Sequence, residues 1–505
     1  MSGFQISTLT PTEERLWHAY PTGALVDLRS GPDDGPGQAT SWPCTRDIRA
    51  EVIAALLTGS GPDANGGAGI KLAGVRVVGR LTLAYTKVPY ALDFEHCCFD
   101  DGLDLTEAET RSVRLRGCSL TVLEANRAEI RGELQMEGCR LNRLSLYAAR
   151  VFEIEIIGTT ITAPPPEPPD ADADWIPPRT AINGDLLVVD TAMYCHDVVV
   201  DGQFRLPGAR IGGYLHLDGA RITHEEPNRP PTPALLAQGL RVDTGIFARR
   251  GNTRAKNPFT VIGGVDLSGA TIKGGFMLPD ADLVDDRGKT ALHADHISVE
   301  GGVNLSGVTA SGAVRLNSAR VVGPLTLSGA RLDTLDASGA RVEGAMFCNE
   351  GFTAHSLDLR RARTATFEDD AASWPVNLRL DGFVYDELMP LPMAEARLPW
   401  LARDAFQPQP YEQLAARWGA TTSLGGCCWL SSGGDVRRRA CRRKHGAFSR
   451  TQRSDMGIGR GWPGCGCWAC SPPDRYTSRP TTPHRWARAA RTSTPSPTPS
   501  TCWCP

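Results

Sequence analysis

Aromatic residues are scarce in this chain of 505 residues: they make up 7% of it, although hydrophobic residues make up 41%. A core built from this composition must be filled mainly by small aliphatic side chains. No apolar run reaches the roughly 18 residues that a membrane helix needs. The first residues also lack the basic and apolar regions of a secretory signal peptide. The sequence therefore predicts a cytoplasmic protein without a membrane helix of its own.

Charge and cysteine are unevenly distributed. Residues 419–505 hold 14 Lys and Arg against three Asp, whereas the rest of the chain carries a formal charge of −14. Eight of the 15 cysteines also follow residue 419. The earlier cysteines mostly stand where other copies of a repeat have Ala, as Cys118 does after Gly117 and Cys139 after Gly138. We therefore expect these earlier cysteines to be small buried thiols in a reducing compartment.

A repeat with a step of about eleven residues runs through most of the chain. Leu305, Leu316 and Leu327 each end an apolar-x-apolar triplet, and a step of eleven separates them. A step of ten or eleven also separates the apolar positions of the N-terminal half, which are Leu72, Leu83, Phe94, Leu105, Leu115, Ala125, Met136, Leu146 and Ile156. A fixed period of this kind is the signature of a repeat architecture.

Each repeat unit alternates inward aliphatic and outward polar residues, which indicates very short β-strands. Glycines between the triplets permit sharp corners. One unit cannot bury its own apolar face, so successive coils must stack to form a continuous core. We therefore predict an all-β fold in which residues 61–390 form a β-solenoid. Ordinary β-sandwich strands are the weaker alternative, because they lack such a constant register.

The repeat resembles that of the pentapeptide-repeat-like solenoids. The triplets Ala281-Asp282-Leu283 and Val303-Asn304-Leu305 are similar to the core motif of those proteins. The resemblance implies a coil with a four-sided cross-section. The unit of eleven residues departs from a clean multiple of five.

Three insertions interrupt the repeat, at residues 163–179, 223–233 and 284–290. The first contains five prolines, which lack the N–H donor that a strand ladder needs. We expect these insertions to project from one side of the solenoid as loops, where binding residues are often found.

Helices are predicted at both ends of the solenoid. Residues 1–60 should form a helical cap: Thr10-Pro11-Thr12-Glu13 is a capping box that opens one helix, and Thr45 should open a second that ends at Gly59. Trp374 to Tyr385 should be the last rung. Residues 391–417 should hold short helices, at 394–403 and 411–416.

The composition changes abruptly after Arg417. Six of the 11 tryptophans follow it, and the periodicity ends there. If the codons are read one base earlier, residues 455–471 permit a Leu- and Trp-rich membrane segment, and residues 426–438 permit a basic segment before it. Our hypothesis is that residues 418–505 form a disordered tail that is translated in a shifted frame.

With the shifted frame, the chain resembles a family of actinobacterial membrane proteins that combine a helical cap, a solenoid and C-terminal membrane helices. The resemblance covers residues 10–417 and is most distinctive at Tyr-Glu-Gln-Leu-Ala-Ala, residues 411–416. The family is often labelled "membrane-associated oxidoreductase". The resemblance therefore implies tethering to the cytoplasmic face of the plasma membrane in relatives with an intact frame.

Four groups of residues were weighed as chemical sites. Gly459-x-Gly461-x-x-Gly464 matches a dinucleotide fingerprint but lacks a preceding strand. Cys465-x-Cys467-x-x-Cys470 with Cys427-Cys428 has metal-ligand residue types, which shifted Leu codons also explain. The other two groups are His293, Asp295 and His296, and His96 with Cys97-Cys98. The first of these two is expected to be solvated, and the vicinal cysteines should point to opposite faces of a strand.

No catalytic residue, cofactor site or metal site follows from these patterns, and nucleic acid is not an expected partner. The function predicted from the sequence is a non-enzymatic solenoid scaffold that binds a protein partner. The alternatives are an oxidoreductase, as the family label implies, and a carbohydrate-active β-helix enzyme. The second alternative would need carboxylates clustered on one outer face across adjacent coils.

Overall fold

The computed structural model describes residues 8–31, 34–60, 69–165, 178–226, 230–251, 256–390 and 394–419, all of which belong to one compact unit. The centre of the first insertion and the tail from residue 420 onward lie outside the described residues, and so does the prediction that the tail is disordered.

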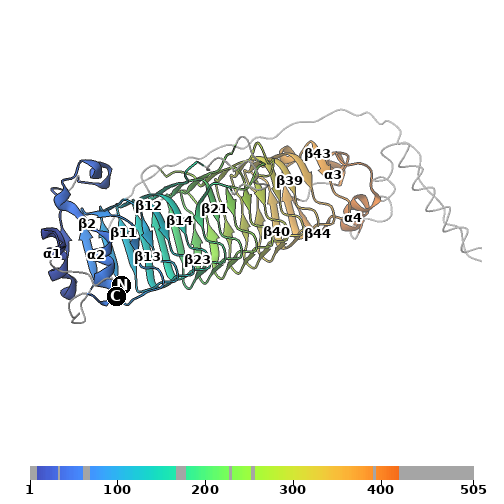
Figure 1. The fold of residues 1–505 in the computed structure, drawn as a ribbon. Coiled ribbons are helices and arrows are strands. Elements are labelled where there is room, and N and C mark those ends of the chain that lie inside the picture. The colour runs from blue at the N-terminus through green and yellow to red at the C-terminus, as the bar shows by residue number, and fades with distance from the viewer. Residues whose placement is uncertain are drawn as a thin grey trace, which may run out of the picture. The chain divides into compact units, whose positions relative to one another are not determined.

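The strands form two parallel sheets, A and B, that face each other across the core (Figure 1). The strands of sheet A are β1 (Val26–Asp27), β3 (Ile70–Ala73), β6 (Lys87–Val88), β7 (Leu92–Glu95), β10 (Glu109–Thr110), β11 (Val113–Arg116), β13 (Glu129–Glu137), β15 (Arg150–Ile157), β18 (Val188–Val189), β19 (Met193–His196), β22 (Arg210–Ile211), β23 (Tyr214–His216), β26 (Arg241–Val242), β27 (Gly245–Phe247), β30 (Thr271–Ile272), β31 (Phe276–Met277), β34 (Ser298–Val299), β35 (Val303–Asn304), β37 (Arg320–Val321), β38 (Leu325–Thr326), β40 (Arg341–Cys348), β42 (Arg363–Asp369) and β44 (Val384–Met389).

The strands of sheet B alternate with them along the chain. They are β2 (Asp47–Arg49), β4 (Arg76–Val78), β5 (Leu81–Thr82), β8 (Cys98–Phe99), β9 (Leu103–Asp104), β12 (Ser119–Glu124), β14 (Arg140–Ser145), β16 (Thr160–Thr162), β17 (Thr180–Asn183), β20 (Val199–Asp201), β21 (Gln203–Arg205), β24 (Arg221–Thr223), β25 (Leu235–Leu236), β28 (Thr260–Ile262), β29 (Val265–Asp266), β32 (Asp282–Val284), β33 (Leu292–His293), β36 (Thr309–Arg315), β39 (Arg331–Asp336), β41 (Thr353–Asp358) and β43 (Asn377–Arg379).

The predicted eleven-residue unit is half of one coil. Val303 in β35 pairs with Leu325 in β38, 22 residues further along the chain. Leu305 and Leu327 therefore follow neighbouring strands of sheet A, whereas Leu316 follows β36 of sheet B. All three side chains are at most 1% exposed. The predicted β-solenoid is thus confirmed, with successive units on opposite walls of one stacked column.

One left-handed residue per half coil turns the chain from one sheet to the other. Gly307, Ser318 and Gly329 have φ values of 66°, 54° and 69°, again in steps of eleven. Glycine adopts this conformation without the steric cost that a side chain brings. The residue after each of them, such as Ala319 or Ala330, is small and buried. This corner explains the small residue of the repeat.

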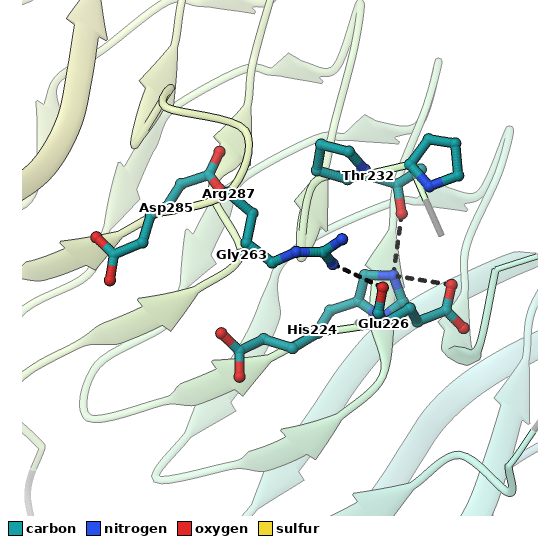
Figure 2. Close-up of a pocket in the computed structure, with 10 residues that line it drawn as sticks. His224, Glu226, Thr232, Gly263, Asp285 and Arg287 are labelled. Carbon is teal, nitrogen blue, oxygen red and sulfur yellow. Dashed lines mark hydrogen bonds and ion pairs between the residues drawn. The ribbon is translucent and has the colours of Figure 1, made fainter. Parts of the chain in front are cut away.

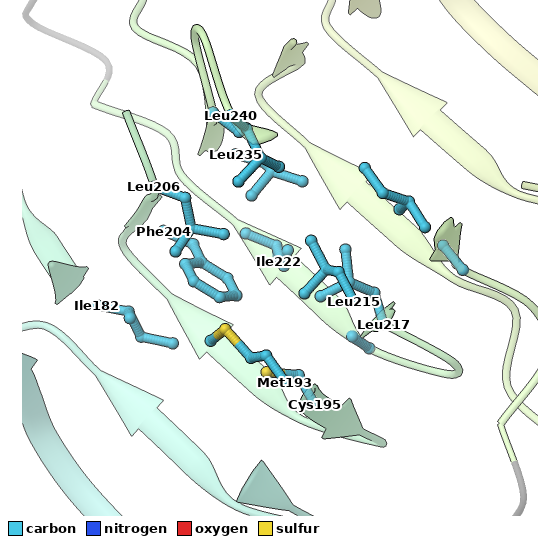
Figure 3. Close-up of a cluster of buried hydrophobic side chains, with 14 of the residues drawn as sticks. Ile182, Met193, Cys195, Phe204, Leu206, Leu215, Leu217, Ile222, Leu235 and Leu240 are labelled. Atoms are coloured by element: carbon cyan, nitrogen blue, oxygen red, sulfur yellow. The ribbon is translucent and has the colours of Figure 1, made fainter. Parts of the chain in front are cut away.

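The core is continuous from coil to coil and almost free of polar atoms. Figure 3 shows its middle, where Met193, Leu215 and Phe204 meet between the two sheets. The nine N-terminal positions that define the repeat are all fully buried. Burial of one such aliphatic side chain contributes about 1.5–3 kcal/mol, so the coils stabilise one another chiefly by stacking.

The N-terminal cap differs from its prediction in one respect. Helix α1 (Pro11–Ala19) begins at the predicted capping box, in which Thr10 and Glu13 exchange hydrogen bonds. The second helix, α2 (Ala50–Ala55), begins at Ala50 and not at Thr45. The residues before α2 form β2, which pairs with β4, while β1 pairs with β3. Backbone pairing with the first coil therefore wins over local helix propensity, and the cap contains a first rung.

The C-terminal end follows the prediction more closely. β43 and β44 form the last rung. Helix α3 (Ala394–Leu401) and helix α4 (Pro408–Gly419) follow it at the end of the column opposite to α1 and α2 (Figure 1). A buried ion pair fixes α3 to the last coils: Arg397 Nη1 lies 2.5 Å from Asp369 Oδ1, and both side chains are at most 3% exposed. None of the helices that the structure describes is long and apolar enough to cross a membrane.

Candidate functional site

The structure brings His293 and Asp295 together but leaves His296 apart. His293 Nε2 lies 3.2 Å from Asp295 Oδ2, and His293 Nδ1 lies 3.5 Å from Asp266 Oδ1 of the neighbouring coil. Arg315 donates to Asp295 at 2.6 Å. His296 is exposed at a left-handed corner. The two carboxylates on adjacent coils are the arrangement that a β-helix glycosidase would need.

Both carboxylates, however, hold backbone turns. Asp266 Oδ1 accepts from the Ser268 amide at 2.9 Å, and Asp295 Oδ1 accepts from the Asn317 amide at 3.0 Å. The turn at Asp266 recurs in other coils, where a side chain accepts from the amide two residues on: at Asp104, Asn183, Asn304, Asp336 and Asp358. The Asp or Asn of the repeat motif therefore closes a turn of the scaffold. The same role accounts for Asp266.

The two neighbouring cysteines point to opposite faces, as predicted. Cys97 is buried and its thiol donates to the Leu72 carbonyl, at 3.5 Å. Cys98 lies on the outer side, and burial is the main cause that raises the pKa of its thiol. Cys118 and Cys139 occupy the position of Cys97 in the next two coils and also donate to backbone carbonyls. These cysteines are packing residues of the corner, and a raised pKa makes the Cys98 thiol a poor nucleophile.

The three predicted insertions leave the solenoid at one corner, between paired strands of sheet B. The first joins β16 to β17, the second joins β24 to β25 and the third joins β32 to β33. Their described ends are linked: the Arg179 amide donates to Glu226 Oε1 at 3.2 Å, and Arg287 donates to the Glu226 carbonyl at 2.6 Å. The expectation that the insertions project from one side is confirmed for these described ends.

A small polar pocket lies between the second and third insertions (Figure 2). His224, which is 3% exposed, forms a hydrogen bond through Nε2 with Thr232 Oγ1 at 3.0 Å. Asp285 accepts from the amides of Gly288 and Thr290 and so shapes the third insertion. These contacts are mutual bonds between loops, and they account for the buried polar groups that line the pocket.

An outward patch of aromatic and imidazole rings lies on sheet A, and the sequence analysis did not find it. Register places Tyr194 of β19, His216 of β23 and Phe247 of β27 in one column across three coils. The His216 ring stacks between the other two, with centroid distances of 5.3 and 5.0 Å. Tyr214 and His196 flank the column. We call these five residues the aromatic platform.

Charged side chains border the platform. The Arg249 guanidinium lies 5.1 Å from the centre of the Phe247 ring, and Asp218, which is 3% exposed, forms an ion pair with Arg249 at 3.0 Å. Burial is the main cause that lowers the pKa of His216, and His196 and Arg249 add to this effect, while Asp218 opposes it. His216 is therefore held neutral as a stacking ring near pH 7.

The platform could not be found by spacing alone, because insertions separate its members by 22 and 31 residues. Alternation did mark each of them as outward-facing. The Gly459 and Cys465 motifs lie outside the described residues. Within the described part, no group of three His, Cys, Asp or Glu side chains is arranged to hold a metal ion.

No family model matches this chain, and no curated protein matches it either. The resemblances noted from the sequence therefore remain proposals, and the function must be argued from the geometry.

Proposed function

We propose that this protein is a non-enzymatic solenoid scaffold that binds a protein partner through the aromatic platform. The observation that carries the proposal is the gathering of Tyr, His, Phe and Arg side chains on one outer face of a rigid sheet. Tyr214 remains 40% exposed despite its ring contacts. Tyr, Trp and Arg are the residue types that dominate the binding energy of protein interfaces.

The scaffold presents these rings with little loss of entropy on binding. Each ring sits on a strand that pairs with neighbours on both sides, so backbone and side chain are already ordered. The stacked rings offer apolar faces to a partner, while Tyr hydroxyls and imidazole nitrogens remain available for hydrogen bonds. By contrast, the described polar clusters at Asp266 and His224 are occupied by bonds within the scaffold.

The experiment is an affinity capture with three versions of the full chain: wild type, Tyr214→Ser and Tyr147→Ser. Tyr147 is a matched control, since it is 39% exposed on a distant coil. We expect at least one protein from the source organism to be retained by wild type and Tyr147→Ser and to be lost with Tyr214→Ser. The interaction should then be reproduced by calorimetry with the purified partner. Equal retention by all three versions would refute the role of the platform.

We further propose that relatives with an intact frame tether this scaffold to the cytoplasmic face of a membrane. The codon argument at residues 455–471 and the family resemblance at residues 411–416 support this proposal. Resequencing the gene around the Arg417 codon tests it. A single missing or additional base would restore the membrane segment, and a confirmed uninterrupted frame would end the idea.

A further inference from the structure

A column of like charges crosses three neighbouring coils of sheet A near the C-terminal end. Arg320, Arg341 and Arg363 are the first residues of β37, β40 and β42, and register places them directly beside one another. Parallel strands are about 4.8 Å apart, so three guanidinium groups leave the same face in close succession. All three side chains are exposed.

The same column is neutralised in the N-terminal coils. There Lys87 faces Glu109 across β6 and β10, with an ion pair of 2.7 Å. Where Glu109 faces Glu129, Arg131 forms ion pairs with both carboxylates. Like charges directly opposite one another destabilise a sheet, and an opposite charge between them removes the cost. The arginine column has no such bridging residue in its centre.

The available carboxylates reach only the two ends of the column. Arg320 pairs with Glu343 at 3.1 Å and Arg363 pairs with Asp386 at 3.5 Å. These four side chains are between 52% and 65% exposed, so each pair contributes little and can rearrange. Among the described residues, none forms a hydrogen bond or ion pair with the Arg341 side chain.

A groove runs along the column. Its volume is about 370 Å³, and its lining consists of the three arginines with Val342, Glu343, Ala365 and Asp386. A guanidinium carries five N–H donors in a planar fork that matches phosphate oxygens. Three forks at the spacing of neighbouring strands can therefore contact successive anionic groups of one ligand.

We propose that this groove binds a ligand that carries two or more phosphate groups. The phosphates bridge Arg341 to its neighbours, as Arg131 bridges the glutamates in the N-terminal coils. The site is separate from the aromatic platform and does not depend on the proposed scaffold function. The ligand is either a free polyphosphate compound or the headgroups of an anionic lipid surface.

The test compares the full-length wild type with Arg341→Gln and Arg331→Gln. Arg331 is exposed on β39 of the opposite sheet, so its substitution removes the same charge outside the groove. Inorganic triphosphate is titrated by calorimetry at two salt concentrations, and vesicles of phosphatidylglycerol are tested by co-sedimentation. The basic residues beyond position 419 are identical in all three proteins, so they contribute the same background. Circular dichroism melts show that each variant is folded.

We expect Arg341→Gln to weaken binding by roughly tenfold or more, because it removes charge-assisted hydrogen bonds, while Arg331→Gln binds like wild type. An effect seen with triphosphate supports a free ligand, and an effect confined to vesicles supports a lipid surface. If Arg341→Gln and Arg331→Gln behave alike with both probes, the proposal is wrong.

Discussion

The buried ion pair between Asp369 and Arg397 should control the stability of the C-terminal end in a pH-dependent way. Burial raises the pKa of Asp369 to about 6, although Arg397 and a 3.0 Å hydrogen bond from Trp374 Nε1 oppose the rise. Arg397 also donates to the Met389 carbonyl and lies over the Trp374 and Trp400 rings. The pair thus connects β42, β44 and α3.

The sign of the pH effect follows from the raised pKa. The folded state binds the Asp369 proton more tightly than the unfolded state, whose carboxyl has the ordinary value of 3.8. The resulting stabilisation is complete below pH 3.8 and is lost as the pH rises through about 6. A shift of about two units corresponds to roughly 3 kcal/mol.

Substitution of Arg397 by Met should enlarge this dependence. At pH 8 the variant buries an ionised Asp369 without its partner, which costs about 3–5 kcal/mol. At pH 5 the carboxyl is protonated and neutral, so the loss should be much smaller. The double variant Asp369→Asn/Arg397→Met removes both charges and should recover most of the loss at pH 8.

Native-state hydrogen exchange measures this effect locally, which is necessary because coils of a repeat protein need not unfold together. Peptides that cover residues 377–401 report the opening free energy of the last rung, and peptides from 113–137 serve as an internal control. A loss that is equal at pH 5 and pH 8, or that spreads to the control peptides, would refute the reasoning.

Three further changes test other parts of the fold. Gly301→Ala should destabilise the protein by about 1–3 kcal/mol in chemical unfolding, since its new Cβ would lie 2.6 Å from backbone of the preceding coil, whereas Gly37→Ala, with open space around it, should have little effect. The lowered pKa of His216 predicts that stability falls as pH drops below 6.5, and His216→Phe should abolish this dependence of the unfolding midpoint. Burial raises the pKa of Glu13, but its bonds with Arg49 and Thr10 produce a net lowering, so its contribution should be lost at pH values below 4.5. Glu13→Gln should remove this acid sensitivity and cost about 1.5–3 kcal/mol in thermal unfolding at pH 7.

The sequence alone predicts the solenoid because every copy of the repeat makes the same physical demand. An inward aliphatic pair, a left-handed corner and a small residue recur in each half coil, so Leu305, Leu316 and Leu327 could be placed correctly. Residues 47–49 could not, since their strand depends on pairing with β4 and not on local propensity. The capping box at Thr10 is local, and its prediction is confirmed.

The candidate sites depend on register between coils, which insertions hide from the sequence. Alternation shows that Tyr194, His216 and Phe247 face outward, but the irregular spacing conceals that they are neighbours. The arginine column is more regular, with steps of 21 and 22 residues, and is visible once the coil length is known. By contrast, the His293 pattern drew attention through residue type alone, and its carboxylates hold turns.

The stacking of coils, on which both surfaces depend, can be measured directly by double electron–electron resonance between nitroxide labels. Arg150 and Arg320 are separated by six strand spacings along one column of sheet A, and Arg150 and Arg363 by eight. At about 4.8 Å per spacing, the account predicts label distances of roughly 29 and 38 Å. Distances that do not increase by about two strand spacings from the first pair to the second would contradict the solenoid.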